Sequence, residues 1–234
     1  MVRNNKQLKM SKKQTFKDYF SAIAAHRIKY RKTRAYYWND ITKYCNYFLH
    51  NELSVLEIGC GTGELIASVK GKRKLGIDFS EKMIQNACKQ FPDVDFKIME
   101  AEQITLNEKF DVIILSNLIG FLDDVENVFK ELKKVSHHKT KIIVTYYNYL
   151  WQPFIKFSEF IGLKKKIPPL NWLSHNDIIN LLYLADFEVY RQNRRILLPF
   201  NIPFISFIFN KYIAKLPFFN YLALNQFVLQ TCPC

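Results

Sequence analysis

The chain has 234 residues, of which 49% are hydrophobic, and it carries a formal net charge of +13. This length suits one domain with additions rather than two large domains. No run of about 18 apolar residues is present that would span a bilayer. The five cysteines lack the paired spacing of a zinc site or a disulfide scaffold. We therefore expect a cytoplasmic protein without a metal site.

The positive charge is concentrated at the two ends of the chain. Six basic residues precede the first acidic residue, Asp18, and no acidic residue follows Glu188. Residues 1–14 contain few large apolar side chains, so we expect a basic disordered tail there. Basic ends are compatible with an anionic membrane surface or with nucleic acid as a partner.

The hydrophobic pattern changes its period along the chain. Between Phe16 and about His50 the apolar residues recur at helical intervals, which predicts two helices. Short β-rich runs then alternate with helical stretches, the runs lying at about 54–58, 74–77, 94–98, 110–115 and 141–146 and the stretches at about 63–70, 80–90 and 122–135. This alternation predicts an α/β fold with a doubly wound, mostly parallel sheet of seven strands.

The last part of the sheet is expected from three further elements. A helix near 175–184 precedes a strand near 187–192, and an apolar strand follows at 227–230. These last two strands are expected to pair as an antiparallel edge of the sheet.

The turn after the first predicted strand contains three glycines within the sequence VLEIGCGTGELI at residues 55–66. In an open α/β sheet this turn borders the ligand crevice, and glycine lets a ligand approach the backbone closely. A dinucleotide fingerprint would place its third glycine at position 64, where this chain has Glu64. An acid in the first helical turn repels a diphosphate. The motif therefore favours a ligand without phosphate.

VLEIGCGTG resembles the first motif of the class I S-adenosylmethionine-dependent methyltransferases. Three further segments resemble later motifs of that family in the same order: GIDFS at 76–80, MEAE at 99–102 and FDVIILSN at 110–117. The resemblance covers about residues 50–148 and implies a Rossmann-like enzyme that transfers a methyl group from S-adenosylmethionine by in-line displacement. The chain also resembles methyltransferase type 11/25-like domains of a bacterial subgroup, some members of which accompany glycosyltransferases.

The resemblance implies roles for individual residues. Asp78 would hold the ribose hydroxyls, and Phe79 would either lie against adenine or belong to the core. Glu100, with the backbone near Ala101, would bind the adenine amino group. Glu57 is expected either near the methionyl ammonium or as a cap of local backbone. The expected cofactor-binding residues are Glu57, Gly59, Cys60, Gly61, Gly63, Asp78, Phe79, Glu100, Ala101, Ser116 and Asn117.

Methyl transfer from a sulfonium requires mainly alignment of the nucleophile and exclusion of water. A general base helps if the acceptor is a hydroxyl. The candidate catalytic residues are His175, Tyr146 and Tyr147, with Asp123 as a further candidate base. A lone histidine before a helix also serves as a cap or packing residue, so the role of His175 stays open.

Two additions to the shared core are expected to shape the acceptor site. Residues 15–50 are predicted to form a helical lid over a methyltransferase domain at 51–234, and residues 193–223 form an apolar insertion. Within the insertion, residues 199–221 combine three prolines, two lysines and many aromatic residues. We expect this segment either to lie on an anionic inner membrane surface or to close the acceptor pocket.

The acceptor class is left open between several alternatives. A small-molecule, lipid or glycan-linked acceptor is the first expectation. Basic ends and abundant tyrosine also suit an RNA methyltransferase, which we weigh as a second possibility. A protein that binds the cofactor without transferring its methyl group is the third.

Overall fold

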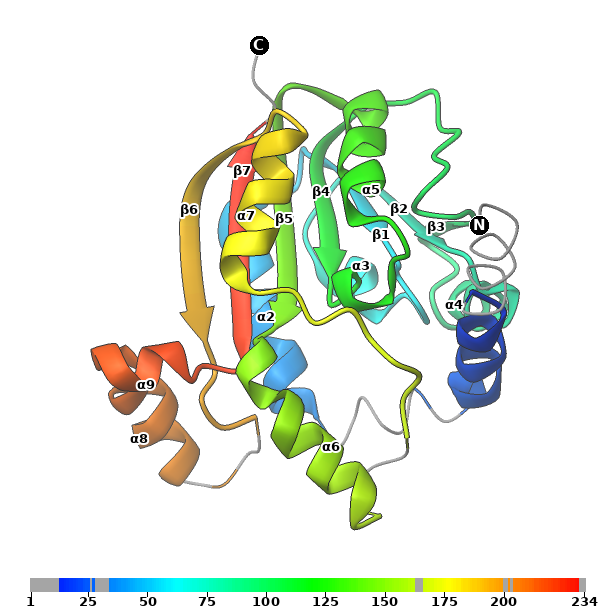
Figure 1. The fold of residues 1–234 in the computed structure, drawn as a ribbon. Coiled ribbons are helices and arrows are strands. Elements are labelled where there is room, and N and C mark those ends of the chain that lie inside the picture. Colours follow the sequence, from blue (N-terminus) through cyan, green and yellow to red (C-terminus); the bar gives the residue numbers. More distant parts are fainter. Residues whose placement is uncertain are drawn as a thin grey trace, which may run out of the picture.

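The computed structural model of the chain describes residues 13–25, 27, 34–162, 166–199, 202 and 204–231 (Figure 1). The basic tail expected at residues 1–14 therefore lies outside the described residues, except for residues 13 and 14, which are helical.

A single seven-stranded sheet organises the chain (Figure 1). Its strands are β1 Ser54–Ile58, β2 Arg73–Asp78, β3 Asp95–Ile98, β4 Phe110–Ser116, β5 Ser136–Tyr147, β6 Glu188–Arg195 and β7 Asn225–Thr231. They lie in the order β3-β2-β1-β4-β5-β7-β6. Strands β1 to β5 run parallel, and β7 lies antiparallel between β5 and β6. The doubly wound, mostly parallel sheet and its antiparallel edge are thus confirmed.

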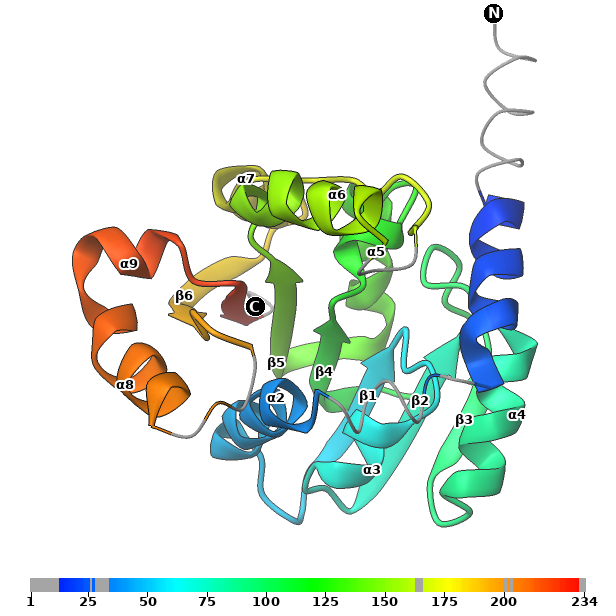
Figure 2. The same ribbon diagram turned by 90° about the horizontal axis from the view of Figure 1, so that it is seen from below.

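Helices cover both faces of this sheet (Figure 2). The longer ones are α2 Ala35–Phe48, α3 Glu64–Ser68, α4 Glu81–Gln90, α5 Val125–Leu132, α6 Gln152–Phe160, α7 His175–Leu184, α8 Ile205–Lys211 and α9 Pro217–Tyr221. Four short 3-10 helices are η1 Ile119–Phe121, η2 Lys133–Val135, η3 Tyr149–Trp151 and η4 Ile213–Lys215. Residues 13–25 form a further helix, called the N-terminal helix below.

The central strands have continuous apolar sequences because both of their faces are buried. In β4, Ile113 and Leu115 belong to one core with Phe129 of α5. The intervening Ile114 belongs to the core on the other face, with Ile41 of α2. Side chains of a strand alternate between its two faces, so one apolar run supplies two cores.

The additions gather at the carboxyl ends of the parallel strands. The N-terminal helix buries Phe16 and Phe20 with Met83 of α4. The insertion at 193–223 continues β6 and then forms α8, η4 and α9, while α6 was not expected from the sequence. In Figure 1 the helices α6, α8 and α9 lie below the arrowheads of β4 and β5. None of the helices within the described ranges is long and apolar enough to cross a bilayer.

Candidate functional site

The turn between β1 and α3 is held in a conformation that requires glycine. Gly59, Gly61 and Gly63 have φ angles of 73°, 56° and 82°. A Cβ atom on Gly63 would lie 2.6 Å from Phe96 Cζ, and one on Gly59 would lie 2.7 Å from Leu118 Cδ1. Positive φ is strained for residues with side chains, so these glycines shape the turn and keep it thin.

Buried polar contacts fasten this turn to its neighbours. The Glu57 carboxylate accepts a hydrogen bond from the backbone N–H of Ile66 at 2.9 Å. This contact matches the capping alternative for Glu57. Cys60 is buried beneath the turn, and burial, followed by the charges of Asp78 and Glu57, raises the pKa of its thiol. A thiol that resists ionisation is a poor nucleophile, which favours a packing role for Cys60.

Asp78 ends β2 with its carboxylate directed at the glycine turn. One carboxylate oxygen accepts from the backbone N–H of Gly61 and the other from that of Ser80, both at 2.9 Å. Burial raises the pKa of Asp78, although these two N–H groups and the Arg27 guanidinium act in the opposite direction. Each carboxylate oxygen has a second lone pair and so retains capacity to accept from a hydroxyl.

A hollow of about 510 Å³ opens beside Asp78. Its wall contains side chains from the ends of β1, β2 and β4 and from the loop after β3: Gly59, Asp78, Phe79, Met99, Glu100, Ala101, Glu102, Leu118, Phe121, Leu122 and Asp123, together with Lys13 and Phe16. An apolar wall with a few carboxylates suits a ligand that has a flat ring and several hydrogen-bond donors.

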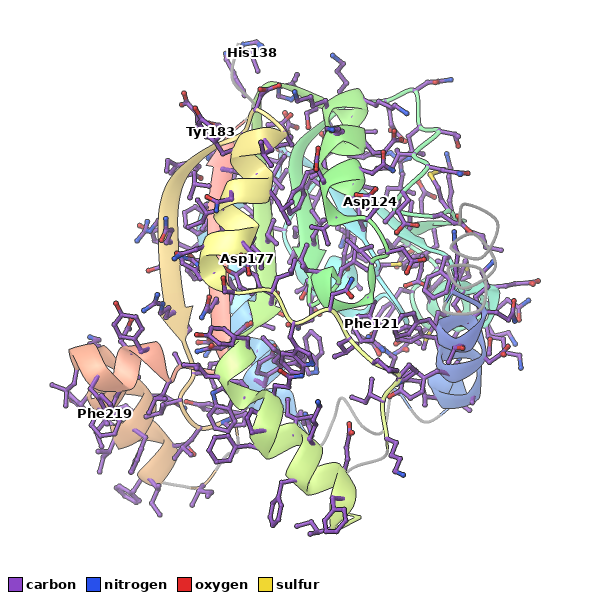
Figure 3. All side chains as sticks on the ribbon, viewed as in Figure 1. Phe121, Asp124, His138, Asp177, Tyr183 and Phe219 are labelled. Atoms are coloured by element: carbon purple, nitrogen blue, oxygen red, sulfur yellow. The ribbon has the colours of Figure 1, made fainter. Side chains whose placement is uncertain are left out.

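The N-terminal helix covers this hollow. Phe16 packs edge-on against Phe121 with ring centroids 5.5 Å apart, and Phe20 packs against Phe79 at 5.7 Å. Lys13 pairs with the Glu100 carboxylate, and the Lys17 ammonium lies 3.7 Å from its other oxygen. In Figure 3, Phe121 lies between the strand ends and this helix. The helix therefore contacts residues that line the hollow through both apolar and charged side chains.

Asn117 at the end of β4 has an unused hydrogen-bond donor. It adopts a φ of 53°, which is uncommon for residues other than glycine. Its side-chain oxygen accepts from the Tyr37 hydroxyl at 3.1 Å. Its side-chain nitrogen is buried and has no hydrogen-bond acceptor among the described residues. A buried donor without a partner costs free energy, and a bound ligand with an acceptor atom would remove that cost.

A second hollow of about 370 Å³ adjoins the first, because Phe121 lines both. Its wall consists of Asn117, Ile119, Gly120, Phe121, Tyr146, Tyr147, Leu170, Asn171, Trp172, Leu173 and Ile178. Tyr147 stacks on Tyr37 of α2 with ring centroids 6.0 Å apart. The second hollow is thus built from Asn117 and η1 after β4, the end of β5, the segment before α7, and α7 itself.

Tyr146 begins a chain of side-chain hydrogen bonds that leads away from the second hollow. Its hydroxyl is hydrogen-bonded to His175 Nδ1, and His175 Nε2 lies 2.7 Å from Gln192 Oε1. The amide oxygen only accepts, so Nε2 carries a proton and Nδ1 accepts from the Tyr146 hydroxyl. Burial raises the pKa of Tyr146 above its ordinary value. With Nε2 bonded to Gln192, His175 Nδ1 faces the Tyr146 hydroxyl and is placed to receive its proton.

Residues 49–175 match the family described as "Methyltransferase domain". The chain belongs to this family. The resemblance to S-adenosylmethionine-dependent methyltransferases is thereby confirmed. A curated relative is the ubiquinone biosynthesis O-methyltransferase of Pelagibacter ubique, which is 26% identical over 144 residues, or 49% of this chain and 60% of that protein. This chain thus spans less than two thirds of the relative's length.

Solved structures of methyltransferases share the fold of this methyltransferase domain. A S-adenosylmethionine-dependent methyltransferase from Thermotoga maritima superimposes with a TM-score of 0.68 and 18% identity, covering 91% of this chain and 97% of that one. The magnesium protoporphyrin IX methyltransferase of Synechocystis PCC 6803, solved with bound S-adenosylhomocysteine, has a TM-score of 0.63 and 14% identity, covering 94% and 99%. At these identities the likeness establishes the Rossmann-like methyltransferase fold.

The predicted site residues of the methyltransferase domain divide into three groups in space. Gly59, Asp78, Phe79, Glu100 and Ala101 line the first hollow. The second hollow contains Asn117, Tyr146 and Tyr147, with His175 behind Tyr146. The remaining ones lie within the glycine turn or at the ends of β1 and β4 and bond within the protein, namely Glu57, Cys60, Gly61, Gly63 and Ser116.

Asp123, the further candidate base, lies on the cofactor side, and Tyr36 and Asn148 contact the insertion. Asp123 lines the first hollow, where its backbone N–H donates to Glu102. The Tyr36 hydroxyl accepts from Asn210, on the side of α8. Asn148 donates to the carbonyls of Tyr221 and Ala223 and so joins β5 to the insertion.

Sequence reasoning missed Arg27 and Gln192. The Arg27 guanidinium lies over the glycine turn, where Nε is 3.2 Å from the position of a Cβ atom on Gly61. Arg27 falls within the helical lid predicted at residues 15–50, and no local pattern indicated that its side chain reaches the turn. Gln192 lies on an exposed edge strand, where a polar residue carries no signal of its own.

Proposed function

We propose that the chain is an S-adenosylmethionine-dependent methyltransferase that modifies a hydroxyl of a small-molecule, lipid or glycan-linked acceptor. The observation that carries this proposal is the pair of adjoining hollows, one bordered by the glycine turn and Asp78 and the other by Tyr146 and Tyr147. When bound, the cofactor supplies a methyl group already activated on a sulfonium. Family membership and the S-adenosylhomocysteine held by the Synechocystis neighbour support this cofactor.

The chain's own residues fit the parts of that cofactor. The Asp78 carboxylate would accept from the ribose hydroxyls, while Phe79 and Met99 offer apolar surface to adenine. Glu100 would accept from the adenine amino group while retaining its contact with Lys13. The unpaired amide nitrogen of Asn117 would donate to an acceptor atom of the methionyl part. Each assignment uses a polar or apolar group that borders the two hollows.

Arg27 is proposed to hold the methionyl carboxylate. Its guanidinium lies over Gly61, and it lowers the pKa of Asp78 against the larger effect of burial. A carboxylate placed between the turn and Arg27 would form a charge-assisted hydrogen bond. This assignment makes the N-terminal helix, together with α2, a lid that closes over the cofactor.

Deleting residues 1–27 should weaken the binding of S-adenosylmethionine by at least about tenfold, since the loss of one hydrogen bond to a charged group costs about 1.5 to 3 kcal/mol. The truncation also removes Phe16 from the wall of the first hollow and Phe20 from its contact with Phe79, but it retains α2 and its buried Ile41. Isothermal titration calorimetry measures the change. Deletion of residues 1–12 serves as the control and should leave the affinity unchanged. Equal affinity for both truncations would contradict the lid.

The proposed acceptor is a hydroxyl because the second hollow contains a route for its proton. Tyr146 would take the acceptor's proton as its own phenol proton passes to His175 Nδ1. Gln192 holds His175 in the tautomer that leaves Nδ1 free to receive it. Because burial raises the pKa of Tyr146, the phenol stays protonated at neutral pH and acts as a relay.

The surroundings of the second hollow favour a small or amphiphilic acceptor over RNA. Apolar and aromatic side chains dominate its wall, including Ile119, Trp172 and Leu173. Single-stranded RNA is bound by aromatic platforms within a basic groove, and no lysine or arginine is among the described residues that line this hollow. We further propose that the chain acts in the cytoplasm, with a peripheral membrane contact that is argued below. The described cysteines Cys45, Cys60 and Cys88 are free, as suits a reducing compartment.

The proposed function is tested by supplying the purified protein with S-adenosylmethionine labelled on its methyl group. Lipid, RNA and small-molecule fractions of a cell extract serve as acceptor pools. We expect label in the lipid or small-molecule pool, in a bond that has the alkaline stability of a methyl ether. Label confined to RNA would contradict the proposed acceptor and would identify the protein as an RNA methyltransferase. Cofactor binding without label in any pool would favour a protein that binds S-adenosylmethionine without transferring its methyl group.

A further inference from the structure

Helix α6 exposes an aromatic face although it lies in a folded domain. None of its nine residues is buried. Phe154, Phe157 and Phe160 are 67%, 62% and 85% exposed. Their spacing of three residues places them along one side of the helix. Three exposed phenylalanines on one helix form an apolar surface that calls for a partner.

The insertion forms a second exposed apolar surface. Phe204 is 83% exposed and Phe218 is 71% exposed, with Phe207 and Tyr212 between them at 53% and 56%. Of the residues in α8 and η4, only Ser206 and Ala214 are buried. The aromatic side chains of the insertion therefore contribute little to the core of the domain.

The two surfaces are joined at their bases. The Trp151 indole N–H donates to the carbonyl of Leu222 at 2.8 Å, and the Asn148 side chain donates to the carbonyl of Ala223 at 3.0 Å. Both surfaces lie beyond the carboxyl ends of the strands, where Figure 3 shows Phe219 on α9. We call the exposed side chains of residues 149–161 and 202–221 together the apolar rim.

Positive charge accompanies the apolar rim. Its basic residues are Lys156, Lys211 and Lys215, and within the described part of these two stretches the acidic residue is Glu159. Glu159 accepts from the backbone N–H of Ile167 at 3.3 Å. The Lys211 ammonium lies over the Phe207 ring, 4.7 Å from its centre, so cation and ring are adjacent on this surface. Aromatic side chains with adjacent lysines match an anionic bilayer, whose interface accepts the rings while its headgroups meet the ammonium groups.

We propose that the apolar rim docks on the surface of an anionic lipid bilayer. The docking surface includes α6 as well as the insertion, and it goes beyond the proposed function because it requires no methyl transfer. Tyr146 and Tyr147 of the second hollow are followed directly by Asn148 and η3, from which α6 continues. A bilayer on the rim would thus lie beside the second hollow, where an amphiphilic acceptor would enter with its apolar part still in lipid.

Co-sedimentation with vesicles tests the docking surface. The vesicles are of phosphatidylcholine alone or of phosphatidylcholine mixed with phosphatidylglycerol. The intact chain should partition onto the mixed vesicles, and the combined variant Phe154→Ser, Phe157→Ser and Phe160→Ser should bind them at least about tenfold less. Replacing Lys211 or Lys215 with glutamine should reduce binding about fivefold each at low salt. The matched control replaces Tyr47 and Tyr183, which are 74% and 78% exposed outside the rim, with serine and should bind normally.

Three results would overturn the docking surface. The first is equal binding of the intact chain to both kinds of vesicle, and the second is equal binding of the phenylalanine variant and the control. The third is a concentration-dependent dimer without vesicles that the phenylalanine variant abolishes, which would assign the rim to a second copy of the chain. Circular dichroism verifies that each variant is folded. Cofactor affinity, measured for each variant by calorimetry, should not change, so failure of the docking surface is distinguished from failure of the proposed function.

Discussion

Replacing Asp78 with alanine should weaken the binding of S-adenosylmethionine by about 1 to 3 kcal/mol, or about 5- to 150-fold. The carboxylate would lose its proposed contacts with the ribose hydroxyls. It also accepts from the backbone N–H groups of Gly61 and Ser80, so its removal leaves two buried donors of the turn without partners. Isothermal titration calorimetry with S-adenosylmethionine and S-adenosylhomocysteine measures the loss.

The control for this substitution is Asp93→Ala, which removes an exposed carboxylate on the loop before β3. Its affinity should equal that of the unchanged chain. A thermal melt shows whether Asp78→Ala is folded. An unfolded variant would bind no cofactor, so only a folded variant reports the loss of ligand contacts. If folded Asp78→Ala binds the cofactor with unchanged affinity, the ribose contact lies elsewhere.

The affinity should also depend on pH through Asp78. Burial raises its pKa, so protonation begins at a higher pH than for an ordinary aspartate. The charged form accepts two hydroxyl donors, whereas the protonated form accepts fewer. Affinity should therefore be full above the raised pKa and fall as pH is lowered through it. Asp78→Asn should flatten this decline.

Replacing Tyr146 with phenylalanine should lower turnover of a hydroxyl acceptor by about 10² to 10⁴, the usual contribution of a positioned acid or base. The phenol is the group that connects the second hollow to His175. His175→Ala should cause a loss of similar size, and the double variant should lose no more than either single variant because the two groups act as a unit. Steady-state transfer of labelled methyl groups to the acceptor identified above provides the measurement.

Cofactor binding distinguishes this catalytic effect from damage to the fold. Tyr146→Phe and His175→Ala should retain their affinity for S-adenosylmethionine, since neither residue lines the first hollow. Tyr183→Phe, an exposed tyrosine on the same helix as His175, is the control and should keep full turnover. Unimpaired transfer by both Tyr146→Phe and His175→Ala would rule out the proton relay and leave His175 as a packing residue.

The sequence by itself determined the sheet and the family. Strands buried on both faces need continuous apolar runs, so β1 was predicted at residues 54–58 and is found there. The helix predicted near 175–184 is found with these bounds, and Ser174 and Asp177 form a capping box at its start. The three glycines likewise identified the turn, since only glycine adopts positive φ without strain. All of these signals are local in the chain.

Only the tertiary structure decided which distant residues share a site. Tyr37 meets Asn117 across 80 residues, and Tyr146 meets His175 across 29. These pairs depend on the order of the strands and on the packing of α2 and α7. The local periodicity of hydrophobic residues predicts neither of them. Helix α6 escaped prediction because none of its residues is buried, so it lacks the alternation of apolar and polar faces that packing imposes on a helix. Its exposed phenylalanines became informative only when their positions beyond the strand ends were known.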